Sequence, residues 1–185
     1  MATLLNPGER EILVAIARHA IETFVRTGHV VAAEREEPAL NQHRGCFVTI
    51  HRQGELRGCI GTFTAARPLW REVAAMAVSA ATRDPRFNPM KERELADFSL
   101  EISVLSPLEE TDEPGKIEVG KHGIYLERDG NRGVLLPQVA VEQGWDRQTF
   151  LRQTCRKAGL APDAWAAPGT RLYIFTAEIF GEGNR

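Results

Sequence analysis

A thiol beside a guanidinium is the pair of side chains in this chain whose chemistry is easiest to name. Cys59 and Arg57 lie in the segment Glu55–Thr62, separated by Gly58 and followed by Gly61. Only the thiolate form of cysteine is a good nucleophile, and a nearby cation favours that form. The segment therefore carries a candidate catalytic thiol, Cys59, with Arg57 as the group that would activate it.

The register of the surrounding strands decides whether that thiol is accessible. The composition of a strand is found in Cys46–His51 and again in Glu55–Thr62. The residues between them, Arg52-Gln53-Gly54, are typical of a turn that joins two strands. With a turn of two or four residues, Cys59 lies opposite Val48 and diagonal to Cys46. Apolar surroundings of this kind disfavour a thiolate. A buried, inert cysteine, a reactive or redox-sensing cysteine, and a cysteine on a partner or ligand surface all stay open.

The two glycines of the segment indicate a close approach of another group. Gly58 and Gly61 weaken a strand, so they mark a bulge or a place where another backbone or a ligand comes near. The alanine-rich segment Pro68–Thr82 is the helix that would pack there. Helix packing and ligand or partner binding are the two interpretations of these positions.

A second group of candidate residues follows that helix, in Asp84-Pro85-Arg86-Phe87. Pro85 ends the helix, because the residue before a proline avoids helical geometry. A carboxylate at this end of a helix opposes the macrodipole, so Asp84 needs a local partner, either an arginine neighbour or an Asx turn. The alternative is that the planar guanidinium of Arg86 binds an anionic ligand or partner.

Histidine is the remaining candidate for proton transfer. His122 lies between Gly120 and Gly123, so its ring could project into a cleft and serve catalysis with Cys59 and Asp84. Metal-ligand spacings, glycine-rich phosphate loops and the G-x-S-x-G motif are absent from the sequence. We therefore predict no metal site and no cofactor.

The elements that must position these residues mix helices and strands without regular alternation. Helices are predicted from the Asn6 cap to Gly28, over Pro68–Thr82 and Pro137–Gln143, and from the Asp146 cap to Gly159. Strands are predicted over Cys46–His51, Glu55–Thr62, Phe98–Val104, Ile124–Arg128, Arg132–Leu136 and Leu172–Phe180. Residues 28–45 form a long polar loop suited to touching a partner. This pattern favours the α+β class with a mainly antiparallel sheet.

Composition narrows the range of partners. The 185 residues carry a net charge of −2 without a run of Lys and Arg, so a nucleic-acid partner is not expected. No apolar stretch approaches the ~20 residues that span a bilayer, so a membrane partner is not expected either. Three widely spaced cysteines and an N-terminus without signal-peptide layout predict a protein of the reducing cytoplasm.

Taken together, the motifs resemble the AMMECR family, whose prokaryotic members are known as protein A of the AmmeMemoRadiSam system. The resemblance spans nearly the whole chain, and the hexapeptide Leu56–Gly61 is its hallmark. The matching segments are Gly45–Ile50, Leu56–Gly61, Asp84–Phe87, Ile102–Glu109, His122–Ile124, Leu136–Ala140, Phe150–Leu151 and Cys155–Leu160.

The resemblance implies a single domain over residues 1–185, made of two unequal subdomains with a cleft between them. The larger would hold an antiparallel sheet of about five strands with flanking helices, and the smaller would lie within about residues 115–160. Family members occur with a Memo-like protein and a radical-SAM protein, but no activity is established for the family. Gln138, within one matching segment, joins Arg57, Gly58, Gly61 and Arg86 as a candidate for ligand or partner binding.

Two functions follow from these residues. The first is a non-catalytic binding or adaptor module that acts with Memo-like and radical-SAM proteins. The second is a thiol-dependent enzyme or carrier that uses Cys59 in the cleft between the subdomains, with His122 or Asp84 handling protons.

Overall fold

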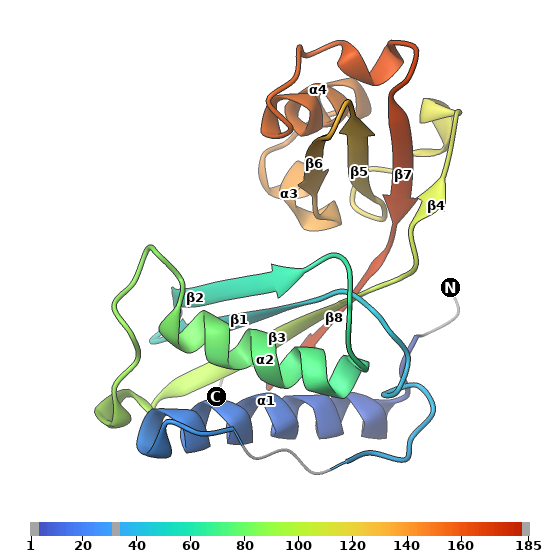
Figure 1. Ribbon diagram of the computed structural model, residues 1–185. Helices are drawn as coiled ribbons and strands as arrows, with labels where there is room; N and C mark the ends of the chain where they lie inside the picture. The colour runs from blue at the N-terminus through green and yellow to red at the C-terminus, as the bar shows by residue number, and fades with distance from the viewer. Residues whose placement is uncertain (1–3, 31–33, 183–185) are drawn as a thin grey trace. The chain divides into compact units, whose positions relative to one another are not determined.

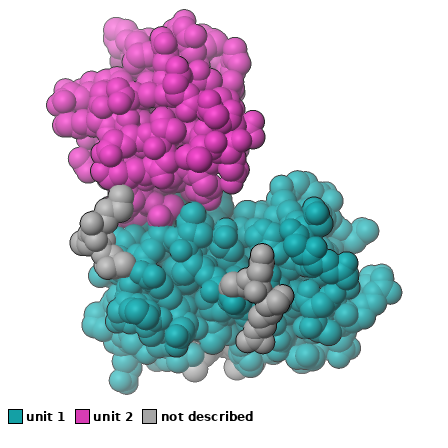
Figure 2. Space-filling model, turned by 180° about the vertical axis from the view of Figure 1, so that it is seen from behind, with its two compact units in different colours: residues 1–105, 178–185 teal, residues 106–177 magenta. Residues whose placement is uncertain are grey.

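The computed structural model describes residues 4–30 and 34–182 (Figure 1). The chain divides into two compact units, which Figure 2 shows in different colours. The first takes in residues 1–105 and 178–185, and the second takes in residues 106–177.

The first unit is a sheet covered by two helices. Its helices are α1 (Pro7–Thr27) and α2 (Leu69–Thr82), and its strands are β1 (Cys46–Arg52), β2 (Glu55–Thr62), β3 (Phe98–Leu105) and β8 (Ala177–Gly181). The strand order is β2-β1-β3-β8, so β2 is an edge strand. β1 pairs antiparallel with both of its neighbours. Of the predicted loop over residues 28–45, residues 31–33 lie outside the described residues.

Helix α1 begins and ends as its sequence predicts. Asn6 caps it, and the Asn6 and Glu9 side chains each accept a hydrogen bond from the other residue's backbone N–H, which makes a capping box. Gly28 ends the helix in the left-handed conformation, with a φ of 75°.

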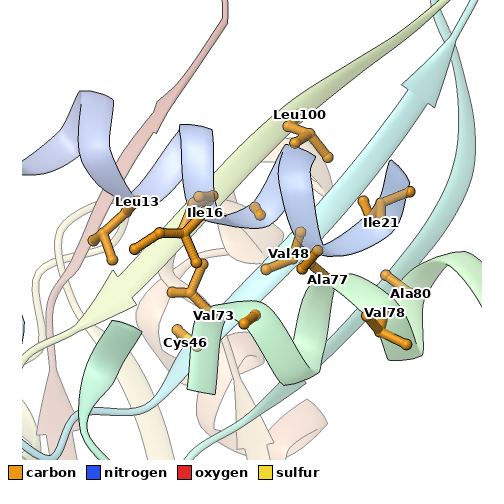
Figure 3. Close-up of a cluster of buried hydrophobic side chains, with 14 of the residues drawn as sticks. Leu13, Ile16, Ile21, Cys46, Val48, Val73, Ala77, Val78, Ala80 and Leu100 are labelled. Carbon is orange, nitrogen blue, oxygen red and sulfur yellow. The ribbon is translucent and has the colours of Figure 1, made fainter. Parts of the chain in front are cut away.

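Both helices pack against the same face of the sheet (Figure 1). The close-up in Figure 3 shows their side chains meeting those of β1 and β3. The residues that fill this layer include Leu13, Ile16 and Ile21 from α1, Val73 and Ala77 from α2, and Cys46, Val48 and Leu100 from the strands. Their removal from water is the main favourable term in the folding of this unit.

A β-bulge in the hairpin of β1 and β2 overturns the predicted register of Cys59. Gln53 and Gly54 make the turn with φ values of 54° and 82°, as a type I′ hairpin turn requires, and Arg52 pairs with Glu55. The register then shifts between Ile50 and His51, which leaves Arg57 as the extra residue of β2.

Beyond the bulge, Cys59 pairs with Thr49 and not with Val48. The predicted register, with Cys59 opposite Val48 and diagonal to Cys46, is therefore wrong, because one extra residue moves a side chain to the other face. Cys46 and Val48 are fully buried under the helices, whereas Cys59 is only partly buried.

The second unit has a sheet and a core of its own. Its strands are β4 (Glu109–Glu110), β5 (Gly123–Arg128), β6 (Asn131–Leu135) and β7 (Arg171–Phe175), in the order β4-β7-β5-β6, and its helices are α3 (Pro137–Glu142) and α4 (Arg147–Lys157). Asp146 caps α4 through the backbone N–H of Thr149. Phe150, Ile124 and Leu126 are fully buried in this core.

The α+β class is confirmed. In the described part of the chain the strands form two antiparallel sheets of four, whereas the family resemblance implies a sheet of about five strands in the larger subdomain. The predicted final strand, Leu172–Phe180, is two strands that belong to different sheets. Within residues 4–30 and 34–182, none of the helices has the length and apolar character needed to cross a bilayer.

Candidate functional site

The open edge of β2 is joined to the end of α2 by the Asp84 carboxylate. The backbone N–H of Cys59 points away from β1 and donates a hydrogen bond to Asp84 Oδ2 at 2.9 Å. An unpaired donor on a sheet edge is a site for unwanted pairing. Asp84 satisfies that donor, and the proline-ended helix is what brings the carboxylate to the strand.

Asp84 and Arg86 form a bidentate ion pair beside the thiol. Arg86 Nε and Nη2 donate to the two carboxylate oxygens at 3.0 and 2.7 Å, and the Arg86 backbone N–H donates at 3.0 Å in an Asx turn. The Asp84 side chain is 3% exposed and that of Arg86 is 54% exposed. The hydrogen bonds from Arg86 hold the pKa of Asp84 well below its ordinary value.

Cys59 is in contact with polar groups on the face of the sheet that α1 and α2 leave open. Thr49 Oγ1 donates a hydrogen bond to Sγ at 3.2 Å. The pKa of Arg86 is raised, first by its hydrogen bond to Asp84 and to a smaller degree by the charge that Cys59 would carry as a thiolate. The arginine that shares the Asp84 carboxylate with the Cys59 backbone is thus Arg86, whereas the sequence suggested Arg57 as the neighbouring cation.

Arg57 is bound elsewhere, to Glu94. Its Nε donates to Glu94 Oε1 at 2.8 Å, and its Nη2 donates to the carbonyl oxygen of Asn88 at 2.9 Å. The hydrogen bond from Arg57 lowers the pKa of Glu94, whose side chain is 11% exposed. Arg52 extends the network, with its Nε 2.7 Å from Asp97 Oδ1.

This network forms the wall of a pocket of about 720 Å³. The pocket is lined by Arg52, Arg57, Phe87, Asn88, Pro89, Met90, Lys91, Arg93 and Glu94. Its volume lies within the range of small-molecule sites. Every residue of the lining belongs to the first unit, so the pocket depends on one sheet edge and the segment between α2 and β3.

The two glycines of β2 face opposite sides of the sheet. Gly58 is buried, and a Cβ there would overlap the carbonyl oxygen of Ala80 in α2. A Cβ at Gly61 would meet the ring of Phe47 and the carbonyl oxygen of Cys46. Both glycines therefore serve packing within the first unit, and neither lines the pocket.

Two predicted site residues, His122 and Gln138, belong to the second unit. His122 Nδ1 accepts a hydrogen bond from the backbone N–H of Glu118 at 3.1 Å. Gln138 lies in α3, and its Oε1 is buried without a hydrogen-bond partner among the described residues. The structure brings Cys59, Asp84 and Arg86 together in the first unit.

Sequence reasoning missed Lys91, Arg93 and Glu94. The signal was present in Lys91-Glu92-Arg93-Glu94, a run of alternating charge directly after Pro89 and Met90. Among the described residues, no three His, Cys, Asp or Glu side chains come close enough to ligate a metal ion.

Comparisons with known proteins show the family and support the fold. The family model described as AMMECR1 matches residues 14–180. A protein of Thermococcus gammatolerans is 46% identical, covering 93% of this chain and 89% of its own. One of Methanothermobacter thermautotrophicus is also 46% identical, covering 96% of both chains. The crystal structure of an uncharacterized protein from Pyrococcus horikoshii has a TM-score of 0.88 at 41% identity, covering 98% of this chain and 95% of its own. The chain belongs to the AMMECR1 family.

Proposed function

We propose that this protein is a non-catalytic binding module that acts with protein partners, namely the Memo-like and radical-SAM proteins of its family context. The observation that carries the proposal is the pocket beside β2. The Lys91 and Arg93 side chains are exposed at this pocket and pair with no other described residue. Exposed, unpaired cations around a concave surface are suited to recognition.

The state of the neighbouring carboxylates supports binding over catalysis. Asp84 and Glu94 have lowered pKa values because Arg86 and Arg57 donate hydrogen bonds to them. A general base works best with a pKa near the operating pH. Both carboxylates are therefore weak bases, and their role is to fix the arginines.

The extent of the family match supports treating the two units as parts of one domain, because the model spans residues from both. The free cysteines Cys46, Cys59 and Cys155 support the cytoplasm as the compartment, since thiols persist in reducing surroundings.

Charge reversal at the pocket tests the proposal. We expect the purified chain to bind the Memo-like or radical-SAM protein of the same organism, and Lys91→Glu with Arg93→Glu to weaken that binding by about tenfold or more. Arg156→Glu with Lys157→Glu makes the same change of charge on α4 and should leave binding unchanged. Isothermal titration calorimetry measures the affinity of the unsubstituted chain and of both double variants for the partner protein. Failure of the unsubstituted chain to bind either protein would contradict the proposal.

The accessibility of Cys59 favours a thiol-dependent enzyme or carrier as the second candidate. Cys59 is the partly exposed cysteine, it accepts a hydrogen bond from Thr49, and it lies in the field of Arg86. A thiol with a neighbouring cation and an open approach is the arrangement that nucleophilic or carrier cysteines share.

Alkylation of the folded protein examines that candidate. We expect Cys59 alone to react with iodoacetamide, because Cys46 and Cys155 are fully buried and burial raises the pKa of Cys46 to about 12. Cys59→Ser should abolish the reaction, as peptide mass spectrometry would show. Reaction faster than in the urea-unfolded chain at the same pH would support an activated thiol. A thiol unreactive up to about pH 9 would rule this function out.

A further inference from the structure

The pocket beside β2 holds more positive charge than the chain neutralises. Its four cations are Arg52, Arg57, Lys91 and Arg93. Glu94 pairs with Arg57, and Asp97, just outside the lining, pairs with Arg52. The carboxylate of Glu92 lies 3.7 Å from Arg26, which also pairs with Glu22, and it forms no ion pair with Lys91 or Arg93. Lys91 and Arg93 thus have no ion-pair partner among the described residues, in a chain whose net charge is −2.

One hydrogen-bond donor in the wall is also unused. Arg57 Nη1 is buried and has no partner among the described residues, although Nε and Nη2 of the same guanidinium are both engaged. A buried donor without a partner costs free energy. The guanidinium of Arg57, a residue of the pocket lining, therefore keeps one hydrogen-bonding group that the described residues do not use.

An apolar and aromatic surface adjoins these charges. Phe87, Pro89 and Met90 lie in the lining, and Met90 is buried. The Arg57 and Arg86 guanidinium carbons lie 5.8 and 5.5 Å from the centroid of the Phe87 ring, so both cations are in range of its π-system. The ring is partly exposed, which leaves it available to an organic group beside the anion.

We infer that the pocket binds the phosphate monoester of a small phosphorylated molecule, with the organic body of that molecule against Phe87 and Pro89. The inference rests on the proposed binding function and names the ligand of its pocket. A phosphate monoester carries about −1.5 to −2 at pH 7, which matches the two cations without an ion-pair partner, Lys91 and Arg93. A single carboxylate would leave one of them uncompensated.

The pocket geometry favours a small molecule over a nucleic-acid strand. The four cations line one concave surface formed by Arg52, Arg57 and part of the segment 87–94. A nucleic-acid strand needs a basic groove that follows successive phosphates. A volume of about 720 Å³ accommodates a ligand of nucleotide size.

Calorimetric titration of the full chain with AMP, ribose 5-phosphate, inorganic phosphate and adenosine tests the inference. We expect AMP to bind, adenosine not to bind, and Lys91→Ala with Arg93→Ala to weaken AMP binding by about tenfold or more. Arg156→Ala with Lys157→Ala is the matched control and should bind AMP like the unsubstituted chain. Binding should weaken with added salt.

The titrations with phosphorylated compounds separate the contribution of the phosphate charge from that of the organic part of the ligand. AMP binding tighter than that of ribose 5-phosphate supports the contact with Phe87, and equal binding overturns that part of the inference. No heat with AMP, ribose 5-phosphate or inorganic phosphate up to about 10 mM, or equal binding by the pocket and control variants, overturns the phosphate site.

This outcome is independent of the protein partner. If AMP binds and the Lys91 and Arg93 variants lose it, the ligand assignment stands even when no Memo-like or radical-SAM protein is bound. If a partner protein binds through the pocket but no phosphate compound does, the proposed function as a binding module is supported and the proposed phosphate ligand is wrong.

Discussion

Replacing Gly58 with alanine is expected to lower the free energy of unfolding by about 3 kcal/mol. The new Cβ would overlap the carbonyl oxygen of Ala80 in α2. Backbone atoms cannot move aside as a flexible side chain can, so β2 and α2 would have to separate. Because both elements contribute to the main core, the loss should appear as a lower urea midpoint.

Gly115→Ala is the matched control for this substitution. Gly115 has no atom within 4 Å of its Cβ position and its φ is not in the left-handed region, so we expect a change within about 0.5 kcal/mol. A Gly58→Ala protein as stable as that control would show that the strand and the helix are not in close contact.

Replacing Asp84 with alanine is expected to cost about 3 kcal/mol of stability. The substitution removes the acceptor for the Cys59 backbone N–H and leaves Arg86 without its bidentate partner. Asp84→Asn keeps an acceptor for Cys59 and loses the charge, so it should cost about half as much. Urea unfolding of the three proteins at neutral pH measures both differences.

The pH dependence of this effect has a definite sign. The pKa of Asp84 in the folded state is below its ordinary value of 3.8. Its stabilising contribution is therefore complete well above pH 4 and is lost as the pH falls through the folded-state pKa. The difference in free energy of unfolding between the unsubstituted protein and Asp84→Asn should be constant around neutral pH and should decrease below about pH 4. A gap that stays unchanged down to about pH 2 would mean that ionisation of Asp84 contributes nothing.

Local sequence signals were enough to predict most elements of this fold. The Asn6 cap and Gly28 set the ends of α1, and Asp129-Gly130 sets the hairpin of β5 and β6. These signals act within a few residues. The class followed from the mixture of helices and strands, without any knowledge of which strands pair.

The orientation of Cys59 needed information that is not local to it. The bulge at Arg57 is favoured by contacts of Arg57 with Glu94 and Asn88, which are more than 30 residues away in the chain. The hairpin turn alone predicts the register without a bulge. For the same reason the partner of Cys59 was misassigned, since Arg86 reaches it only after α2 has folded against the sheet.

The prediction of a single final strand over residues 172–180 was wrong for a different reason. Residues 172–180 have a continuous strand pattern, and periodicity does not show which sheet a strand joins. Thr176 separates β7 from β8, and the two strands pair in different sheets. Only the pairing partners, β5 for one and β3 for the other, reveal the change.

That division of the final segment sets the order in which the units can be completed during synthesis. The second unit is continuous in sequence, so all four of its strands have been synthesised once β7 has been made. The first unit begins earlier but cannot cover the edge of β3 until β8 emerges. In most chains the N-terminal part folds first. Here the nascent chain must hold that edge unpaired while the whole second unit is translated.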